Sequence, residues 1–355
     1  MMNSLMAMAA AAGLLAQVVN AGSEGSRDAS LRFRGDGKFK IVQFTDIHWL
    51  QNADKDQKIR QKILADMDAV LEAEHPDLVV LTGDIVTPTS GESPLPQWTK
   101  VTAPMATRHI PWAAVFGNHD DEWNRTFSRK DIMAYLEKLP ESVSQCGPDE
   151  LGAGGNYVLK IKAAHADKPA AAIYCLDSHA YSTDRKLYGT YGWFSFAQAG
   201  WFRQQSKSLT AANGNATLPA LAFFHIPLPE FKQASVVSLG NQREESHGAS
   251  LNPGMFTAMV ESRDVIGIFV GHDHINDFAG RAFGICLGYG RKTGVDFAAY
   301  GKFLPSGARV IELQEGKPAF ETWIRTGDNK VESRILYPDG FDALEKQAAA
   351  TAKKP

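Results

Sequence analysis

The residues best suited to chemistry lie in the tetrapeptide Gly117-Asn118-His119-Asp120, which directly follows the apolar run 113–116. Such a run predicts a buried strand that ends in a tight turn. Asn118 can offer a carbonyl oxygen to a cation, and His119 can donate a proton near neutral pH. We expect Asp120 to hold the imidazole of His119 in one orientation. Similar triplets occur by chance, so the prediction depends on partners elsewhere in the chain.

Four other apolar runs also end in residues that can bind metal. Carboxylate and imidazole groups suit divalent transition metals. With His119 set aside as a proton donor, the five runs supply seven candidate ligands: Asp46, His48, Asp84, Asn118, His225, His272 and His274. Seven ligands are too many for one tetrahedral ion and fit two ions that share a ligand. Asp84 is the natural bridge, because one carboxylate has two oxygens to share.

Two such ions would support a displacement reaction. A pair held about 3.5–4 Å apart can stabilise both the attacking and the leaving oxygen of an in-line displacement. It also lowers the pKa of bound water from about 15.7 towards neutrality, so that hydroxide becomes available without a strong base. We therefore expect attack by a hydroxide that bridges the metals.

The elements that must position these residues alternate between strand and helix in the first half of the chain, whereas the second half is dense in strands. This pattern predicts an α/β (α+β) fold of two sheets packed face to face with helices outside. Ligands on the loops after strand ends lie where open α/β sheets place their sites. The expected strands are 39–44, 78–81, 113–116, 157–161, 172–176, 221–224, 265–270, 308–313 and 319–324, and the expected helices include 59–71, 129–139, 196–209 and 256–262.

Composition excludes several classes of protein. The chain has 355 residues and a formal net charge of −3, so no broad basic surface suggests a nucleic-acid partner. The three cysteines, Cys146, Cys175 and Cys286, are odd in number and have no CxxC spacing. They therefore predict neither a disulfide framework nor a zinc knuckle.

The two ends of the chain differ from its middle. Residues 1–21 have an apolar centre and a small-residue cleavage site, which predicts a signal peptide and a secreted or periplasmic protein. No Lys or Arg precedes the apolar centre, so a cytoplasmic protein with an uncleaved leader is the alternative. The leader is too short and Ala-rich to span a membrane, and we expect no stable membrane insertion. We expect a linker at 22–37, one domain at 38–326 and a C-terminal tail at 327–355, which frays from Asp342 onward.

The five motifs, in their order and at their strand ends, resemble the five blocks of the calcineurin-like metallophosphoesterases. Stretches around them are similar to the small purple-acid-phosphatase-like enzymes of plants and their fungal relatives, and the resemblance covers roughly residues 39–324. It implies a four-layer sandwich of two mixed sheets flanked by helices. The motifs are Asp46-x-His48, Gly83-Asp84, Gly117-Asn118-His119-Asp120, His225 and Gly271-His272-x-His274.

The resemblance also implies a role for each residue. The first metal would be bound by Asp46, His48 and His274, and the second by Asn118, His225 and His272. Asp84 would lie between the metals, and His119, oriented by Asp120, would protonate the leaving alkoxide. Purple acid phosphatases carry a tyrosine ligand three residues after the bridging Asp, where this chain has Thr87, and they lack a histidine at position 48. A pair of Mn, Fe or Zn ions is therefore favoured over a tyrosinate-bound ferric site, and ligand types alone do not identify the metals.

The predicted activity is hydrolysis of a phosphomonoester, carried on a small molecule or a phosphoprotein. One alternative keeps the chemistry and takes a phosphodiester, such as a cyclic nucleotide or a glycerophosphodiester. Another is a metal-binding scaffold without catalysis, which would be expected to lack a catalytic residue, whereas His119 and Asp120 are present. Specificity is expected in the loops 87–96 and 147–155, which carry no readable chemistry.

Several further polar residues have two interpretations each. His179 and His247 could line the mouth of the pocket or serve only the fold. Arg291 could bind phosphate oxygens or lie in a solvated turn. Asn276 and Asp277 could orient the ligand histidines or cap a loop. Asp273 is expected to support its turn, and His75, His109 and His165 are expected at the surface.

Overall fold

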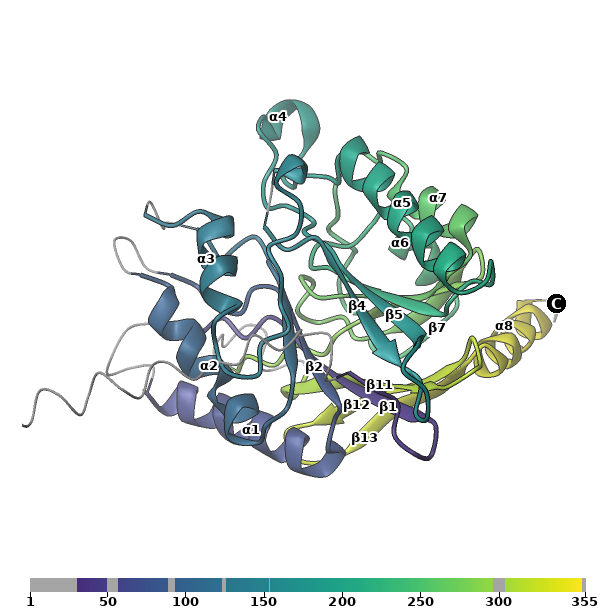
Figure 1. Ribbon diagram of the computed structural model, residues 1–355, viewed down its shortest axis with the longest axis horizontal. Helices are drawn as coiled ribbons and strands as arrows, with labels where there is room; N and C mark the ends of the chain where they lie inside the picture. The colour runs from purple at the N-terminus through teal and green to yellow at the C-terminus, as the bar shows by residue number, and fades with distance from the viewer. Residues whose placement is uncertain are drawn as a thin grey trace, which may run out of the picture. The chain divides into compact units, whose positions relative to one another are not determined.

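The fold is described from a computed structural model that covers residues 31–49, 57–88, 93–122, 126–152, 154–295 and 304–352. The predicted leader at 1–21 lies outside the described residues, as does the linker up to residue 30. The described part contains two mixed β-sheets that pack face to face, with helices on their outer sides (Figure 1). This architecture is the four-layer sandwich that the resemblance implied.

The first sheet has six strands in the order β13-β12-β11-β1-β2-β3. Strands β1, β2 and β3 run parallel, whereas β11, β12 and β13 form an antiparallel extension beside β1. Parallel pairing brings the carboxyl ends of the first three strands to one edge of the sheet. The bounds are β1 Lys38–Phe44, β2 Leu78–Thr82, β3 Trp112–Val115, β11 Gly307–Gln314, β12 Phe320–Thr326 and β13 Val331–Tyr337.

The second sheet has seven strands in the order β4-β5-β6-β8-β10-β9-β7. Its centre, β5, β6, β8 and β10, is parallel, and the flanking strands are antiparallel. The loops after β6 and β8 therefore lie at one edge of this sheet. The bounds are β4 Tyr157–Lys162, β5 Pro169–Cys175, β6 Ala220–Phe223, β7 Ser238–Leu239, β8 Val265–Val270, β9 Ala279–Ala282 and β10 Ile285–Tyr289.

The helices cover the outer faces of the sheets. In Figure 1, α1, α2 and α3 lie beside the first sheet, and α5, α6 and α7 lie beside the second. The N-cap residues of α3 and α5 are Ser128 and Ser195, each of which forms a reciprocal capping box with the residue three positions on. The bounds are α1 Gln57–Glu74, α2 Leu95–Thr107, α3 Arg129–Leu136, α4 Arg185–Tyr188, α5 Phe196–Ala212, α6 Phe231–Ala234, α7 Met255–Ser262 and α8 Asp339–Ala352.

Alternation along the strands produces the layers. In β1, Ile41 packs into the core between the two sheets, whereas its neighbour Val42 packs towards the helices of the first sheet. In β5, Ile173 faces the core between the sheets and Tyr174 faces the helices of the second sheet. Because β5 is buried on both faces over most of its length, its sequence PAAAIYC is a continuous apolar run, whereas β1 also contains Lys40 and the buried Gln43.

The predicted domain limits were too narrow at both ends. Leu31 and Phe33 are buried, and the Phe33 amide donates to the carbonyl of Lys162, so residues 31–37 belong to the fold and not to the linker. The predicted tail at 327–355 contains β13, which pairs with β12, and α8, whose Phe341 is buried. Residues 331–352 therefore belong to the fold, and the expectation that the chain frays from Asp342 onward is wrong as far as Ala352, where α8 ends.

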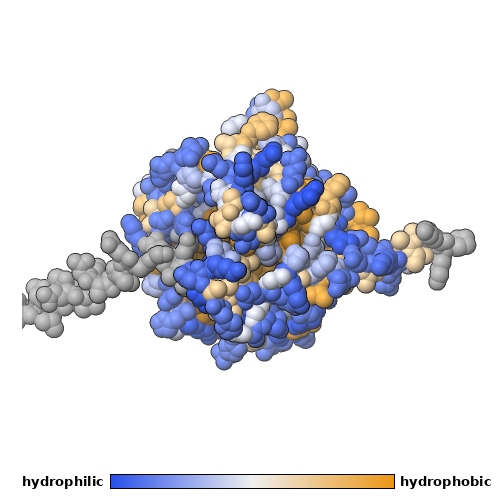
Figure 2. Space-filling view, turned by 45° about the vertical axis from the view of Figure 1, so that its right-hand side comes forward, coloured by the Kyte–Doolittle hydropathy of each residue, from blue (hydrophilic) through white to orange (hydrophobic). Residues whose placement is uncertain are grey.

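Figure 2 shows that hydrophilic side chains cover most of one face, with hydrophobic ones scattered among them. Among the described residues, no helix has the length and hydropathy needed to cross a bilayer.

Candidate metal centre

Five strand ends from the two sheets meet at one place. The loops after β1, β2 and β3 lie close to the loops after β6 and β8. Two glycines permit this approach: a Cβ at Gly117 would lie 2.1 Å from Oδ1 of Asp84, and one at Gly271 would lie 2.0 Å from Oγ1 of Thr45. The strand-end placement predicted from sequence therefore brings the polar residues together.

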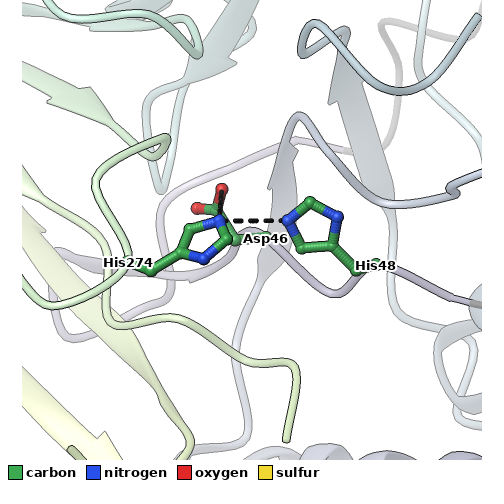
Figure 3. A group of neighbouring side chains, drawn as sticks. All are labelled: Asp46, His48 and His274. Carbon is green, nitrogen blue, oxygen red and sulfur yellow. Dashed lines mark hydrogen bonds and ion pairs between the residues drawn. The ribbon is translucent and has the colours of Figure 1, made fainter. Parts of the chain in front are cut away.

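The first group of side chains consists of Asp46, His48 and His274. Figure 3 shows the two imidazole rings pointing towards each other, with the carboxylate behind them. Nε2 of His48 lies 3.0 Å from Nε2 of His274, and Nε2 of His274 lies 3.4 Å from Oδ1 of Asp46. Two nitrogens and a carboxylate oxygen directed at one point form the donor set of a transition-metal site.

The second group consists of Asp84, His225 and His272. Nε2 of His225 lies 3.1 Å from Oδ2 of Asp84 and 3.3 Å from Nδ1 of His272. Asp84 also reaches the first group, since its Oδ2 lies 3.9 Å from Nε2 of His48. One carboxylate therefore borders both groups, as a bridging ligand must.

Asn118 supplies an oxygen that none of the described protein groups uses. Its Oδ1 is buried and has no hydrogen-bond partner among the described residues, while its Nδ2 donates to the hydroxyl of Tyr181 at 3.2 Å. A buried acceptor without a partner is costly unless something absent from the protein chain satisfies it. A metal ion fits this role, so the residues present suit the pair of metals that the sequence predicted.

Contacts around the ligands fix their orientation. Nδ1 of His225 donates to the carbonyl of Thr82 at 2.9 Å, which leaves Nε2 for the site. Nδ1 of His48 lies 2.9 Å from Oγ1 of Thr87. Thr87 occupies the position where purple acid phosphatases carry their tyrosine ligand, and here its hydroxyl contacts a ligand histidine instead.

The backbone at the ligands is held in an uncommon conformation. The φ angles of Asp46, His48, Asp84 and His272 are 50°, 49°, 50° and 79°. Such left-handed values cost energy in non-glycine residues and persist where the surrounding structure enforces them, most often at functional sites. The strand-end turns therefore fix the positions of these side chains at a cost in the stability of the fold.

The surroundings of most of these groups favour the protonation state that can bind a metal, which is a neutral imidazole or an ionised carboxylate. Burial lowers the pKa of His48 to about 3, and burial together with the charge of His225 lowers that of His272 to about 3. The pKa of Asp46 and that of Asp84 are lowered despite burial, because the nearby histidines stabilise the carboxylates. His225 differs: burial opposes its charge, but the carboxylate of Asp84 raises its pKa to about 9.

The partner predicted for His119 was wrong. The carboxylate of Asp120 accepts the backbone amides of Asp84, Ile85, Val86 and Gly117 at 2.7–2.9 Å, and both of its oxygens are used. Nδ1 of His119 instead donates to Oε2 of Glu122. Sequence reasoning did not identify Glu122 as this partner. The backbone amide of Glu122 donates to the carbonyl of His119, and this turn brings the two side chains, three positions apart, close together.

A cavity of about 260 Å³ opens over the candidate ligands. Besides residues of both groups, it is lined by Tyr191, Glu244 and His247, of which only His247 was considered for the site from sequence. Of the two histidines considered for its mouth, His247 lines it, whereas Nε2 of His179 contacts Gln198 away from it. Oδ1 of Asp273, which was expected to support its own turn, lies 2.8 Å from Nδ1 of His247 and so holds the loop of His247.

The remaining open interpretations are settled by buried contacts. The guanidinium of Arg291 is buried against Asp277 and Glu332, so it neither faces the cavity nor lies in a solvated turn. Oδ1 of Asn276 accepts the amides of Arg243 and Glu244. Asn276 therefore caps the loop 241–247, and Asp277 binds the same loop through Asn241.

Comparisons with known proteins agree with this geometry. The sequence profile described as calcineurin-like phosphoesterase matches residues 39–276. The chain belongs to this family. Its fold resembles that of a dimetal phosphatase from Danio rerio, with a TM-score of 0.54 at 14% identity over 84% of this chain and 98% of the other.

Two relatives come from a plant and a yeast. The chain is 35% identical to the Arabidopsis thaliana protein named "Probable inactive purple acid phosphatase 29", over 88% of this chain and 90% of that protein. It is 33% identical to "Phosphatase DCR2" of Saccharomyces cerevisiae, over 68% of this chain and 45% of the yeast protein. One name describes an inactive protein and the other a phosphatase, so activity must be argued from the site itself.

Proposed function

We propose that this chain hydrolyses phosphomonoesters with two bound transition-metal ions and with His119 as proton donor. The observation that carries the proposal is the position of Asp84, whose Oδ2 lies 3.1 Å from His225 and 3.9 Å from His48. A single carboxylate thus joins two groups of candidate ligands beside a cavity large enough for a phosphoryl group.

The two groups of side chains and the unpartnered oxygen of Asn118 support one proposed set of ligands. Asp46, His48 and His274 would hold one ion, Asn118, His225 and His272 the other, and Asp84 would touch both. Bound there, the metals would polarise the phosphoryl oxygens and supply hydroxide near neutral pH. Mn, Fe and Zn all suit this donor set.

In the proposed reaction, the side chains of the protein position the proton donor and protonate the leaving alkoxide. His119 lines the cavity, and its Nδ1 is occupied by Glu122, so Nε2 is the nitrogen left to protonate a leaving alkoxide. The backbone amide of His119 donates to Oδ1 of Asp84 at 2.8 Å. This bond fixes the proton donor relative to the carboxylate that borders both groups.

Turnover by metal-loaded protein tests the proposal. Protein stripped with a chelator and reloaded with Mn²⁺, Fe²⁺ or Zn²⁺ is assayed on p-nitrophenyl phosphate and on bis(p-nitrophenyl) phosphate. We expect metal-dependent hydrolysis that favours the monoester. A strong preference for the bis ester would establish a phosphodiesterase instead. Metal binding without turnover on either ester would identify a scaffold.

A further inference from the structure

We propose that Glu122 is the positioning residue of His119 and that Tyr181 couples this pair to the metal ligand Asn118. The inference rests on the proposed function, because it assigns how the proton donor of that reaction is held. It concerns four side chains that contact one another in sequence: His119, Glu122, Tyr181 and Asn118.

The first step is the contact between Glu122 and His119. Nδ1 of His119 donates to Oε2 of Glu122, and the side chains are 32% and 22% exposed. A carboxylate on Nδ1 fixes both the rotation of the ring and the tautomer, so that Nε2 faces the cavity. The two neighbouring carboxylates make other contacts and do not bind His119: Asp120 accepts hydrogen bonds from four backbone amides, and Asp121 forms an ion pair with Arg129.

The second step is the hydroxyl of Tyr181. It donates to Oε1 of Glu122 at 3.1 Å and accepts from Nδ2 of Asn118 at 3.2 Å. A phenol has one proton, and here it goes to the carboxylate, so Tyr181 can only accept from the amide of Asn118. The amide nitrogen is thereby held on the side of Tyr181.

The third step concerns the other end of that amide. With Nδ2 fixed on Tyr181, Oδ1 of Asn118 is left buried and without a partner among the described residues, in the orientation that a metal ligand needs. Tyr181 is itself held by Arg185, whose guanidinium carbon lies 4.2 Å from the ring centroid, and by stacking on Tyr191. One hydroxyl therefore orients a metal ligand and, through Glu122, the proton donor.

The consequences for catalysis depend on the leaving group. An alkoxide needs a proton as it departs, whereas a nitrophenolate leaves without one. Loss of Glu122 should therefore slow hydrolysis of an alkyl phosphate far more than that of p-nitrophenyl phosphate. A merely structural role would slow both substrates equally.

The test of Glu122 uses Glu122→Gln in the metal-loaded enzyme with glycerol phosphate and p-nitrophenyl phosphate. We expect kcat on the alkyl ester to fall by about 10²-fold and kcat on the aryl ester by less than about threefold, with KM unchanged. The double variant with His119→Ala should be no slower than His119→Ala alone. Glu141→Gln is the matched control, because Glu141 pairs with Nδ1 of His109 at 3.1 Å on the surface.

A readout that needs no turnover separates this inference from the proposed function. In Zn²⁺-loaded protein with ¹⁵N-labelled histidine, NMR should show His119 protonated at Nδ1, and Glu122→Gln should change that signal. Equal slowing of both esters, or an Nδ1 of His119 that carries no proton, would overturn the role of Glu122. A wild-type enzyme that hydrolyses neither ester would overturn the proposed function. The NMR signal would still show whether Nδ1 of His119 donates to Glu122.

Tyr181→Phe tests the coupling to the metal. Removal of the hydroxyl frees the amide of Asn118, so we expect Zn²⁺ affinity at one of the two positions to fall by about 10–100-fold, measured by competition with a chromophoric chelator. Tyr135→Phe is the control, because its hydroxyl contacts only Oγ1 of Thr99 at 2.6 Å among the described residues. Unchanged affinity in Tyr181→Phe would overturn the coupling.

Discussion

At the scale of single residues, the histidines of this site differ in protonation because their surroundings differ. His48 and His272 are buried without a dominant anion, so burial lowers their pKa. His225 lies 3.1 Å from Asp84, and this carboxylate outweighs burial. Two imidazoles are therefore ready to bind metal at neutral pH, whereas a third must first lose a proton.

This difference predicts how metal binding depends on pH. Without metal, the pKa of His225 is raised to about 9, so at pH 7 the ring is protonated and a metal must displace that proton. We expect Zn²⁺ affinity to rise about tenfold per pH unit between pH 7 and 9 and then to level off. Calorimetric titration in buffers of different ionisation enthalpy measures the proton released. An affinity that does not vary between pH 7 and 9 would contradict the assignment.

His119→Ala tests the proton donor. The imidazole belongs to neither ligand group, so we expect both metals to remain bound while turnover slows by roughly 10²–10⁴, the usual contribution of a positioned general acid. Metal content by elemental analysis and kcat on an alkyl phosphate check the two parts. An unchanged kcat would remove His119 from the mechanism.

At the scale of elements, Asp120 fastens the turn after β2 to the turn after β3. It accepts the amides of three consecutive residues after Gly83 and the amide of Gly117, and it is fully buried. Buried backbone amides need acceptors, and this carboxylate supplies them for two loops that carry candidate ligands. Its role is therefore to hold Asp84 and Asn118 in register.

We expect Asp120→Asn to lower stability and metal affinity together. The new amide group turns donors towards amides that need an acceptor, and each buried group left unpaired costs about 1–3 kcal/mol. Thermal unfolding and Zn²⁺ titration provide the measurements. A variant with normal stability and normal metal content that is only slow in turnover would instead support an orienting role on His119.

The sequence predicted the strands well where polar residues follow an apolar run, and the candidate ligands at those strand ends lie close together in the fold. Leu78 to Leu81 is buried on both faces, and Phe39 to Phe44 is buried apart from the half-buried Lys40, so these strands and the candidate ligands just beyond them could be located. Strand β9, with the sequence AGRA, has no β-branched residue and was missed. The contacts of Glu122 and Tyr181 could not be predicted, because they depend on a turn and on a loop distant in sequence.

At the scale of the whole molecule, the C-terminal strand completes the fold beyond the region that carries the family motifs. β13 pairs with β12, and its Glu332 lies 2.8 Å from Nη2 of Arg291, which is also paired with Asp277. Arg291 is fully buried, so its charge requires both carboxylates. The residues after 326, which sequence reasoning treated as a tail, therefore stabilise the loop that follows β10.

Truncation tests this contribution. A chain ended at residue 327 lacks β13 and exposes the edge of β12, so we expect a clear fall in melting temperature or loss of soluble protein. A chain ended at Ala352, which keeps β13 and α8, is the control. Equal stability of the two chains would show that β13 is dispensable.

The central claim is that Asp84 contacts two metal ions at once. The measurement that tests it most directly is a crystal structure of metal-loaded protein with anomalous scattering collected at the metal edge. We predict two ions about 3.5–4 Å apart, with one carboxylate oxygen or both of Asp84 bound between them. A single ion, or two ions that share no ligand from Asp84, would contradict the account.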